Sequence, residues 1–146
     1  MSRILVAVLV VAALFGVGVA SFRALSDVAG EDGARPVENS AFTVRGRTVT
    51  CAELLPDGCD FDLQHAYDRW GEGLGAYVTS DLGPWGRGLG AQEAAQLGLE
   101  ACITAGVPGR TFLEYLDRVR VDRPEATSPE LFPFWDQARR ILCPSL

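Results

Sequence analysis

The feature that most constrains this chain is an uninterrupted apolar run near its N-terminus, from Ile4 to Phe22. Arg3 precedes the run and Arg23 follows it, with no charged residue between them. A helix over this run would be about 28 Å long, close to the ~30 Å hydrocarbon core of a bilayer. A segment without a polar face does not fit the surface of a small soluble domain. Residues 1–22 are therefore predicted to be a signal peptide or a transmembrane anchor.

Two readings of this segment stay open. Gly18-Val19-Ala20 matches the small-x-small end of a signal peptide, with cleavage after Ala20. An uncleaved segment would instead hold the protein in the membrane through residues 4–22. In both cases we expect the remainder of the chain to be extracytoplasmic, either secreted or anchored to the cytoplasmic membrane.

The number of cysteines supports export. The chain has four, an even number, behind an apolar leader, and this predicts two structural disulfides. Four cysteines allow three connectivities, and we favour Cys51–Cys59 with Cys102–Cys143. The first pair closes a local turn and the second ties a central helix to the last one. No C-x-x-C pair occurs and His65 is the only histidine, so metal binding is the weaker hypothesis, while thiol-redox activity remains an alternative.

The segment behind the apolar run is rich in Gly, Asp, Glu and Pro. Such a composition buries too little apolar surface to offset its ordering entropy, so residues 23–40 are predicted to be a flexible tether. The extracytoplasmic domain then covers residues 41–146. It begins with two β-branched runs, 41–44 and 47–50, and the Arg45-Gly46 pair between them indicates a tight hairpin.

Helical spacing dominates the rest of the domain. Thr50 and Glu53 have capping-box spacing ahead of a short helix, and a longer helix is predicted from about residue 60 to Tyr77, with glycines that let another backbone approach. Residues 81–90 are predicted to be a loop, and a second long helix to cover 91–105. The predicted fold class is mainly α: a small disulfide-stapled helical domain with a short N-terminal β-hairpin, preceded by a hydrophobic export or anchor helix.

Two further helices are expected near the C-terminus. Thr111 and Glu114 repeat the capping-box spacing, and Pro124 ends the helix that follows. Ser128 with Pro129 is typical of an N-cap followed by a first-turn proline, and Pro133 is expected to delay the start of the last helix.

The C-terminal part resembles a family of exported actinobacterial domains of unknown function, DUF732, over about residues 91–144. The motifs that carry the resemblance are Leu97-Gly98-Leu99-Glu100-Ala101-Cys102, Ala105-Gly106, the helix around Phe112 and Leu116, Trp135 to Ala138, and Cys143-Pro144. The resemblance implies an exported helical domain with a Cys–Cys link, and it implies no activity. Because every basic residue is Arg, the composition is also typical of a GC-rich genome.

The glycine-rich segment from Gly83 to Gly90 carries the most distinctive candidate contact residues, Trp85 and Arg87. Trp and Arg are enriched at interaction hot spots, so these two residues are a possible partner contact. The alternative is that Trp85 folds back onto the core.

The remaining charged residues form no recognisable catalytic or metal-binding pattern. His65 has no nucleophile and orienting group in a recognisable pattern. The acidic cluster around Cys59 lacks the spacing of an EF-hand, and the arginines of residues 118–123 alternate with aspartates as on a solvated helix face. The sequence therefore nominates no catalytic, cofactor-binding or metal-binding residue.

Composition excludes one class of partner. The net charge of −6 disfavours nucleic acid. We expect a non-enzymatic binding or interaction module that acts on an unknown envelope protein or ligand. The alternatives are an accessory subunit of a membrane complex and a small exported thiol-redox protein.

Overall fold

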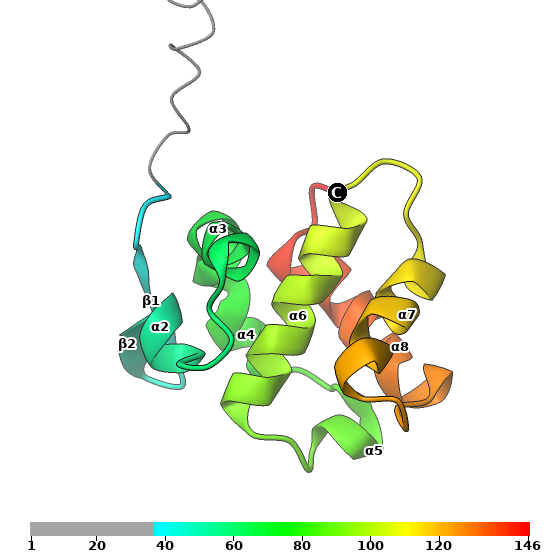
Figure 1. The fold of residues 1–146 in the computed structure, drawn as a ribbon. Helices are drawn as coiled ribbons and strands as arrows, with labels where there is room; N and C mark the ends of the chain where they lie inside the picture. Colours follow the sequence, from blue (N-terminus) through cyan, green and yellow to red (C-terminus); the bar gives the residue numbers. More distant parts are fainter. Residues whose placement is uncertain (1–36) are drawn as a thin grey trace, which may run out of the picture. The chain divides into compact units, whose positions relative to one another are not determined.

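The computed structural model describes residues 37–146, which form a compact unit of their own. The predictions for residues 1–22, and for the tether up to residue 36, lie outside this part. The elements are β1 (Ala41–Val44), β2 (Arg47–Thr50), α2 (Cys51–Leu54), α3 (Phe61–Trp70), η1 (Gly71–Gly73), α4 (Leu74–Val78), α5 (Gly83–Gly86), α6 (Ala91–Ala105), α7 (Phe112–Asp122), α8 (Ser128–Gln137) and η2 (Ala138–Leu142) (Figure 1). Within this range, no helix has both the length and the apolar content that crossing a membrane requires.

The described part is mainly helical with one short hairpin and two disulfides, which confirms the predicted fold class for the domain; the predicted N-terminal helix lies outside the described residues. β1 and β2 pair antiparallel, with Ala41 opposite Thr50 and Val44 opposite Arg47. Arg45 and Gly46 both have positive φ, 50° and 77°, which is the two-residue turn that matches the twist of a hairpin. The hairpin docks on the helices because Val44 and Val49 are buried and the Tyr67 hydroxyl donates a hydrogen bond to the Val49 carbonyl.

α6 is the central helix of the domain. Figure 1 shows it with α3, α4 and the hairpin on one side and α7 and α8 on the other. Its residues are apolar or small on most of its circumference, as expected for a helix that is enclosed by others. The buried positions are Ala94, Ala95, Leu97, Gly98, Leu99, Ala101, Cys102 and Thr104.

The helix predicted from residue 60 to Tyr77 is interrupted, so a single continuous helix is wrong. It runs as α3, one 3₁₀ turn (η1) and α4. Three glycines at the break explain the interruption. A Cβ at Gly71 would lie 2.1 Å from the Phe42 ring, and one at Gly75 would lie 2.8 Å from the Thr43 carbonyl oxygen. These glycines let β1 pack directly on the helix backbone, as the sequence predicted.

Two other predictions near loops need correction. Residues 81–90 are not all loop, because Gly83–Gly86 form the short helix α5. Pro133 does not delay the last helix, which begins at Ser128 and continues through it. Pro133 packs against α5 instead, where a Cβ at Gly83 would lie 3.1 Å from its Cγ.

The N-cap of α8 is Thr127 rather than Ser128. The Thr127 N–H and hydroxyl both donate to the Glu130 carboxylate, at 2.9 and 2.6 Å. This is a third capping box, one residue earlier than the cap that the sequence indicated.

The chain ends its helical part in a π-helical turn, η2. The Cys143 N–H donates to the Ala138 carbonyl at 2.8 Å, a hydrogen bond over five residues. The wider turn keeps Ala138 and Leu142 buried and brings Cys143 next to α6.

Candidate functional site

The structure pairs all four cysteines in the connectivity that the sequence favours. Cys51 is bonded to Cys59, and Cys102 to Cys143, with Cα atoms 5.9 Å apart in each pair. Among the described residues no cysteine is left as a free thiol. Both cysteines of the Cys102–Cys143 bond are fully buried, so attack on this disulfide by an external thiolate requires the domain to open. Cys51 is also buried, but its partner Cys59 is half-exposed.

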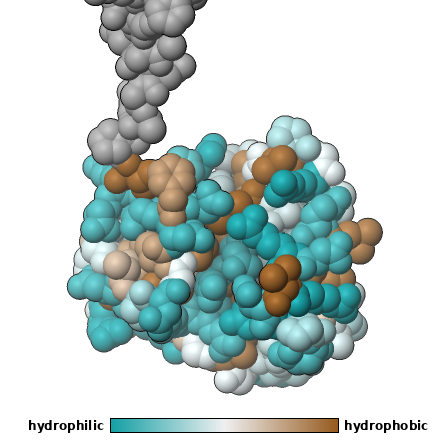
Figure 2. All heavy atoms as spheres, in the orientation of Figure 1, coloured by the Kyte–Doolittle hydropathy of each residue, from teal (hydrophilic) through white to brown (hydrophobic). Residues whose placement is uncertain are grey.

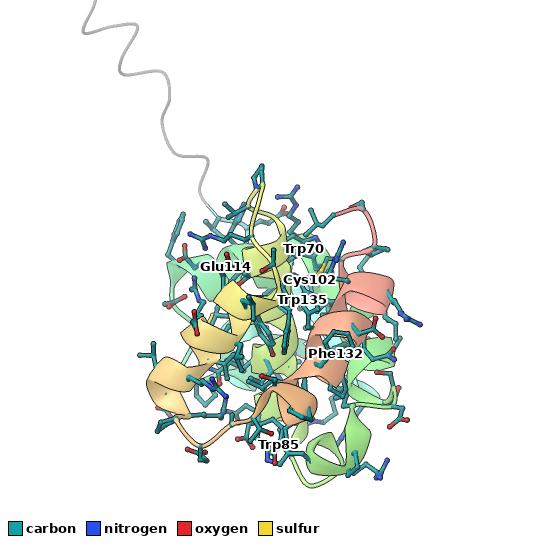
Figure 3. All side chains as sticks on the ribbon, turned by 90° about the vertical axis from the view of Figure 1, so that its right-hand side faces the viewer. Trp70, Trp85, Cys102, Glu114, Phe132 and Trp135 are labelled. Carbon is teal, nitrogen blue, oxygen red and sulfur yellow. A yellow bond between two sulfur atoms is a disulfide. The ribbon has the colours of Figure 1, made fainter. Side chains whose placement is uncertain are left out.

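Trp85 lies on α5 and packs toward the core. Its ring meets the buried Phe134 ring edge-on, with centroids 5.5 Å apart. The indole remains half-exposed. Figure 3 shows Trp85 at the lower edge of the domain, away from Trp135 and Phe132. The structure thus gives Trp85 a packing role and leaves part of its surface open.

Arg87, the other predicted contact residue, lines a pocket of about 360 Å³. The pocket lies where the hairpin turn, the end of α4 and the segment around α5 meet. The lining residues are Arg45, Val78, Thr79, Ser80, Leu82, Gly86, Arg87 and Leu89. We call this the Arg45–Arg87 pocket.

Arg45 is the charged residue of this pocket that the sequence did not nominate as a contact. It is more than 40 positions from Arg87 in the chain, and only the docking of the hairpin beside α4 brings the two arginines to one pocket. One sequence signal was present: an Arg at the first position of a two-residue turn that favours Asn, Asp or Gly.

A second pocket, of about 410 Å³, lies on α8 and η2. Arg139 stacks over the Trp135 ring at 5.7 Å, and Arg140 pairs with Asp136 at 3.1 Å. Phe132, which lines this pocket, is exposed but makes an edge-to-face contact with Phe112, with centroids 5.3 Å apart. The charged and aromatic groups here therefore already have intramolecular partners.

The charged clusters that the sequence raised also have structural partners. Asp60 caps α3 by accepting from the Leu63 N–H at 2.9 Å, and Asp62 faces Arg118 at 4.0 Å. Arg123 pairs with Glu93 at 3.1 Å. Within residues 37–146 no three His, Cys, Asp or Glu side chains gather as metal ligands would.

Tyr77 and Tyr115 are fully buried tyrosines of the core. Burial raises the pKa of Tyr77 and of Tyr115, and neither hydroxyl has a hydrogen-bond partner among the described residues. Burial also raises the pKa of Glu100, and the opposing influence of Arg118 and Arg123 is smaller. Tyr77 and Tyr115 are fully enclosed and offer no access for a ligand, whereas Glu100 is half-exposed.

Exposed apolar side chains are scattered rather than gathered. Figure 2 shows hydrophobic residues as separate patches on a mainly hydrophilic face. Scattered apolar residues are normal on a soluble surface. The large exposed ones are Phe61, Val107, Leu113, Val121 and Phe132.

Comparisons of the chain with protein-family models, with curated proteins and with solved structures find no match. What the Arg45–Arg87 pocket can bind therefore follows from its lining residues alone.

Proposed function

We propose that this protein is a non-enzymatic binding or interaction module of the cell envelope, placed outside the cytoplasmic membrane by its N-terminal apolar segment. The observation that carries the proposal is the pairing of all four cysteines in two disulfides. Such bonds persist in oxidising compartments and are rare in the cytosol.

The position of the disulfides supports a structural role for them. Cys102–Cys143 joins the central helix to the end of the helical part across 41 positions, and both of its cysteines are buried. A catalytic disulfide needs an exposed sulfur and a low-pKa thiol. The buried Cys102–Cys143 bond therefore favours the binding module over the thiol-redox alternative, which is left with the Cys51–Cys59 bond, where Cys59 is half-exposed.

The proposed relation to DUF732 domains points in the same direction. That resemblance covers about residues 91–144, from the start of α6 past the end of η2. It implies an exported helical domain with a Cys–Cys link, and a disulfide does join the two cysteines in question. The accessory-subunit alternative differs only in requiring an uncleaved N-terminal segment.

Location is testable with a reporter that folds only in an oxidising compartment. Alkaline phosphatase fused behind Leu146 of the full chain is expected to be active in an actinobacterial host. Leu9→Arg combined with Leu14→Arg, which breaks the apolar run, is expected to abolish this activity. Leu9→Ile with Leu14→Ile is the matched control. An active fusion with the charged variant, or an inactive one with the native chain, would contradict the proposal.

A further inference from the structure

The Arg45–Arg87 pocket is assembled from three separate segments. Arg45 comes from the hairpin turn, Val78 to Ser80 from the end of α4, and Leu82 to Leu89 from α5 and its flanks. Its volume of about 360 Å³ falls within the ~300–1,000 Å³ range of small-molecule sites. The pocket is thus large enough for a compact ligand.

The charge of the pocket is opposite to that of the protein. Both charged residues in its lining are arginines and no carboxylate lines it, although the chain carries 19 acidic and 13 basic residues. Arg45 takes part in no ion pair among the described residues. The lining therefore attracts anions.

Arg87 forms a weak ion pair with Asp81. Its guanidinium lies 3.4 Å from Asp81, and the two side chains are 67% and 80% exposed. Exposed pairs of this kind contribute little, so an anionic ligand can displace Asp81 from Arg87.

The two hydroxyl groups in the pocket already donate their protons to backbone carbonyls. Ser80 donates its proton to the Tyr77 carbonyl at 2.7 Å, and Thr79 donates to the Gly75 carbonyl at 3.0 Å. Each hydroxyl has one proton to donate, so the two arginines supply the side-chain donors. Guanidinium groups bind carboxylates and phosphates through charge-assisted, often bidentate hydrogen bonds.

The lining of the pocket is mainly polar and includes three large apolar side chains. Val78 and Leu82 belong to the buried core, and Leu89 is a partly buried residue packed against that core. A short apolar part of a ligand would contact these side chains.

Arg45 holds a backbone conformation that arginine rarely adopts. Its φ is 50°, in the left-handed region that favours Gly, Asn or Asp. Strained positions of this kind concentrate at functional sites, which fits an arginine kept here for its guanidinium.

We propose that the Arg45–Arg87 pocket binds a small organic anion, in which a carboxylate or phosphate meets the two guanidiniums and a short apolar part lies on Val78 and Leu82. This inference deepens the proposed binding function and rests on it. Its test uses purified protein, so its failure is distinguishable from a wrong cellular location.

The test is an NMR titration of the ¹⁵N-labelled full chain in a non-ionic detergent, with hexanoate, hexyl phosphate and hexanol as separate probes. Hexanoate or hexyl phosphate is expected to give saturable shifts at Arg45, Ser80 and Arg87, and the stronger of the two identifies the anion. Hexanol is expected to give none. A saturable response to hexanol at the same residues, or none to either anion, would overturn the proposal.

Variants separate recognition from folding. Arg45→Gln and Arg87→Gln are each expected to weaken anion binding roughly tenfold, since each removes charge-assisted hydrogen bonds. Arg45→Asn is expected to weaken binding as well. Because Asn suits the turn geometry, that loss cannot be attributed to misfolding. Arg110→Gln, in an exposed loop, is the matched control and is expected to bind normally. An equal loss with Arg110→Gln would reject the site.

Discussion

At the level of single residues, Arg45 links local strain to a candidate function. Its left-handed backbone carries a cost of about 1–2 kcal/mol for a residue with a Cβ, which Asn lowers because it tolerates this region best. Arg45→Asn is expected to raise the free energy of unfolding by about 0.5–1 kcal/mol while it lowers anion affinity. Chemical denaturation of both proteins measures the first effect, and a destabilised variant would contradict the account.

The three tyrosines predict how stability changes at alkaline pH. Burial raises the pKa of Tyr67, Tyr77 and Tyr115, the only tyrosines of the chain. Because the folded state holds the neutral phenols, stability is unaffected below the ordinary pKa of about 10. It is expected to fall as the pH rises above that value through the raised pKa values.

The ultraviolet absorbance of tyrosinate measures this directly. The native protein is expected to show no tyrosinate until its helical circular dichroism is lost. The same chain in guanidinium chloride should titrate near pH ~10. Tyrosinate that forms while the helices remain intact would show that the rings are not enclosed as described.

Sequence reasoning at the residue scale succeeded where the signal was local. The Arg45-Gly46 turn and the cysteine pairs were predictable from turn chemistry and spacing. The contact between the hairpin and α4 that assembles the Arg45–Arg87 pocket was not, because no local pattern encodes which segment covers Gly71 and Gly75.

At the level of elements, three helices share the same N-terminal capping motif. α2, α7 and α8 each begin with a Thr-x-x-Glu capping box, at Thr50, Thr111 and Thr127. Two of these were predictable from their spacing. The third was missed because Ser128-Pro129 also matches the pattern of an N-cap followed by proline. The Glu130 carboxylate, three residues after Thr127, makes Thr127 the N-cap.

These boxes predict how stability responds to acid. Hydrogen bonds from the cap threonines lower the pKa of Glu53, Glu114 and Glu130. Their contribution is therefore present above the ordinary glutamate pKa and is lost as the pH falls through the lowered values. Glu114→Gln is expected to lower stability at neutral pH and to flatten its dependence on acid.

Denaturation midpoints across the acid range check this prediction. Glu125→Gln, in the exposed connection before α8, is the matched control and should keep the native pH profile. Identical profiles for Glu114→Gln and the native protein would show that the α7 capping box makes no contribution to stability.

At the level of the whole molecule, the two disulfides differ in the length of chain that they close into a loop. The Cys102–Cys143 bond spans 41 positions and joins the central helix to the chain end, whereas Cys51–Cys59 spans 8. On a loop-entropy argument the longer loop contributes about 4 kcal/mol and the shorter about 2.5 kcal/mol.

Paired serine substitutions test this order. Cys102→Ser with Cys143→Ser is expected to lower the free energy of unfolding by more than Cys51→Ser with Cys59→Ser. The reason is that the longer bond removes more freedom from the unfolded chain. Urea denaturation of the two variants gives the comparison. A larger loss from the local pair would show that the domain depends on the hairpin end rather than on the helical part.

The proposal of an exported domain locked by two disulfides is tested most directly by the intact mass of the protein recovered from its host's envelope. With alkylating agent added before any reductant, the mass should show no alkylated cysteine, on either the full-length chain or a form without residues 1–20. An alkylated cysteine on the native protein, or its recovery from the cytoplasm with reduced thiols, would contradict the account.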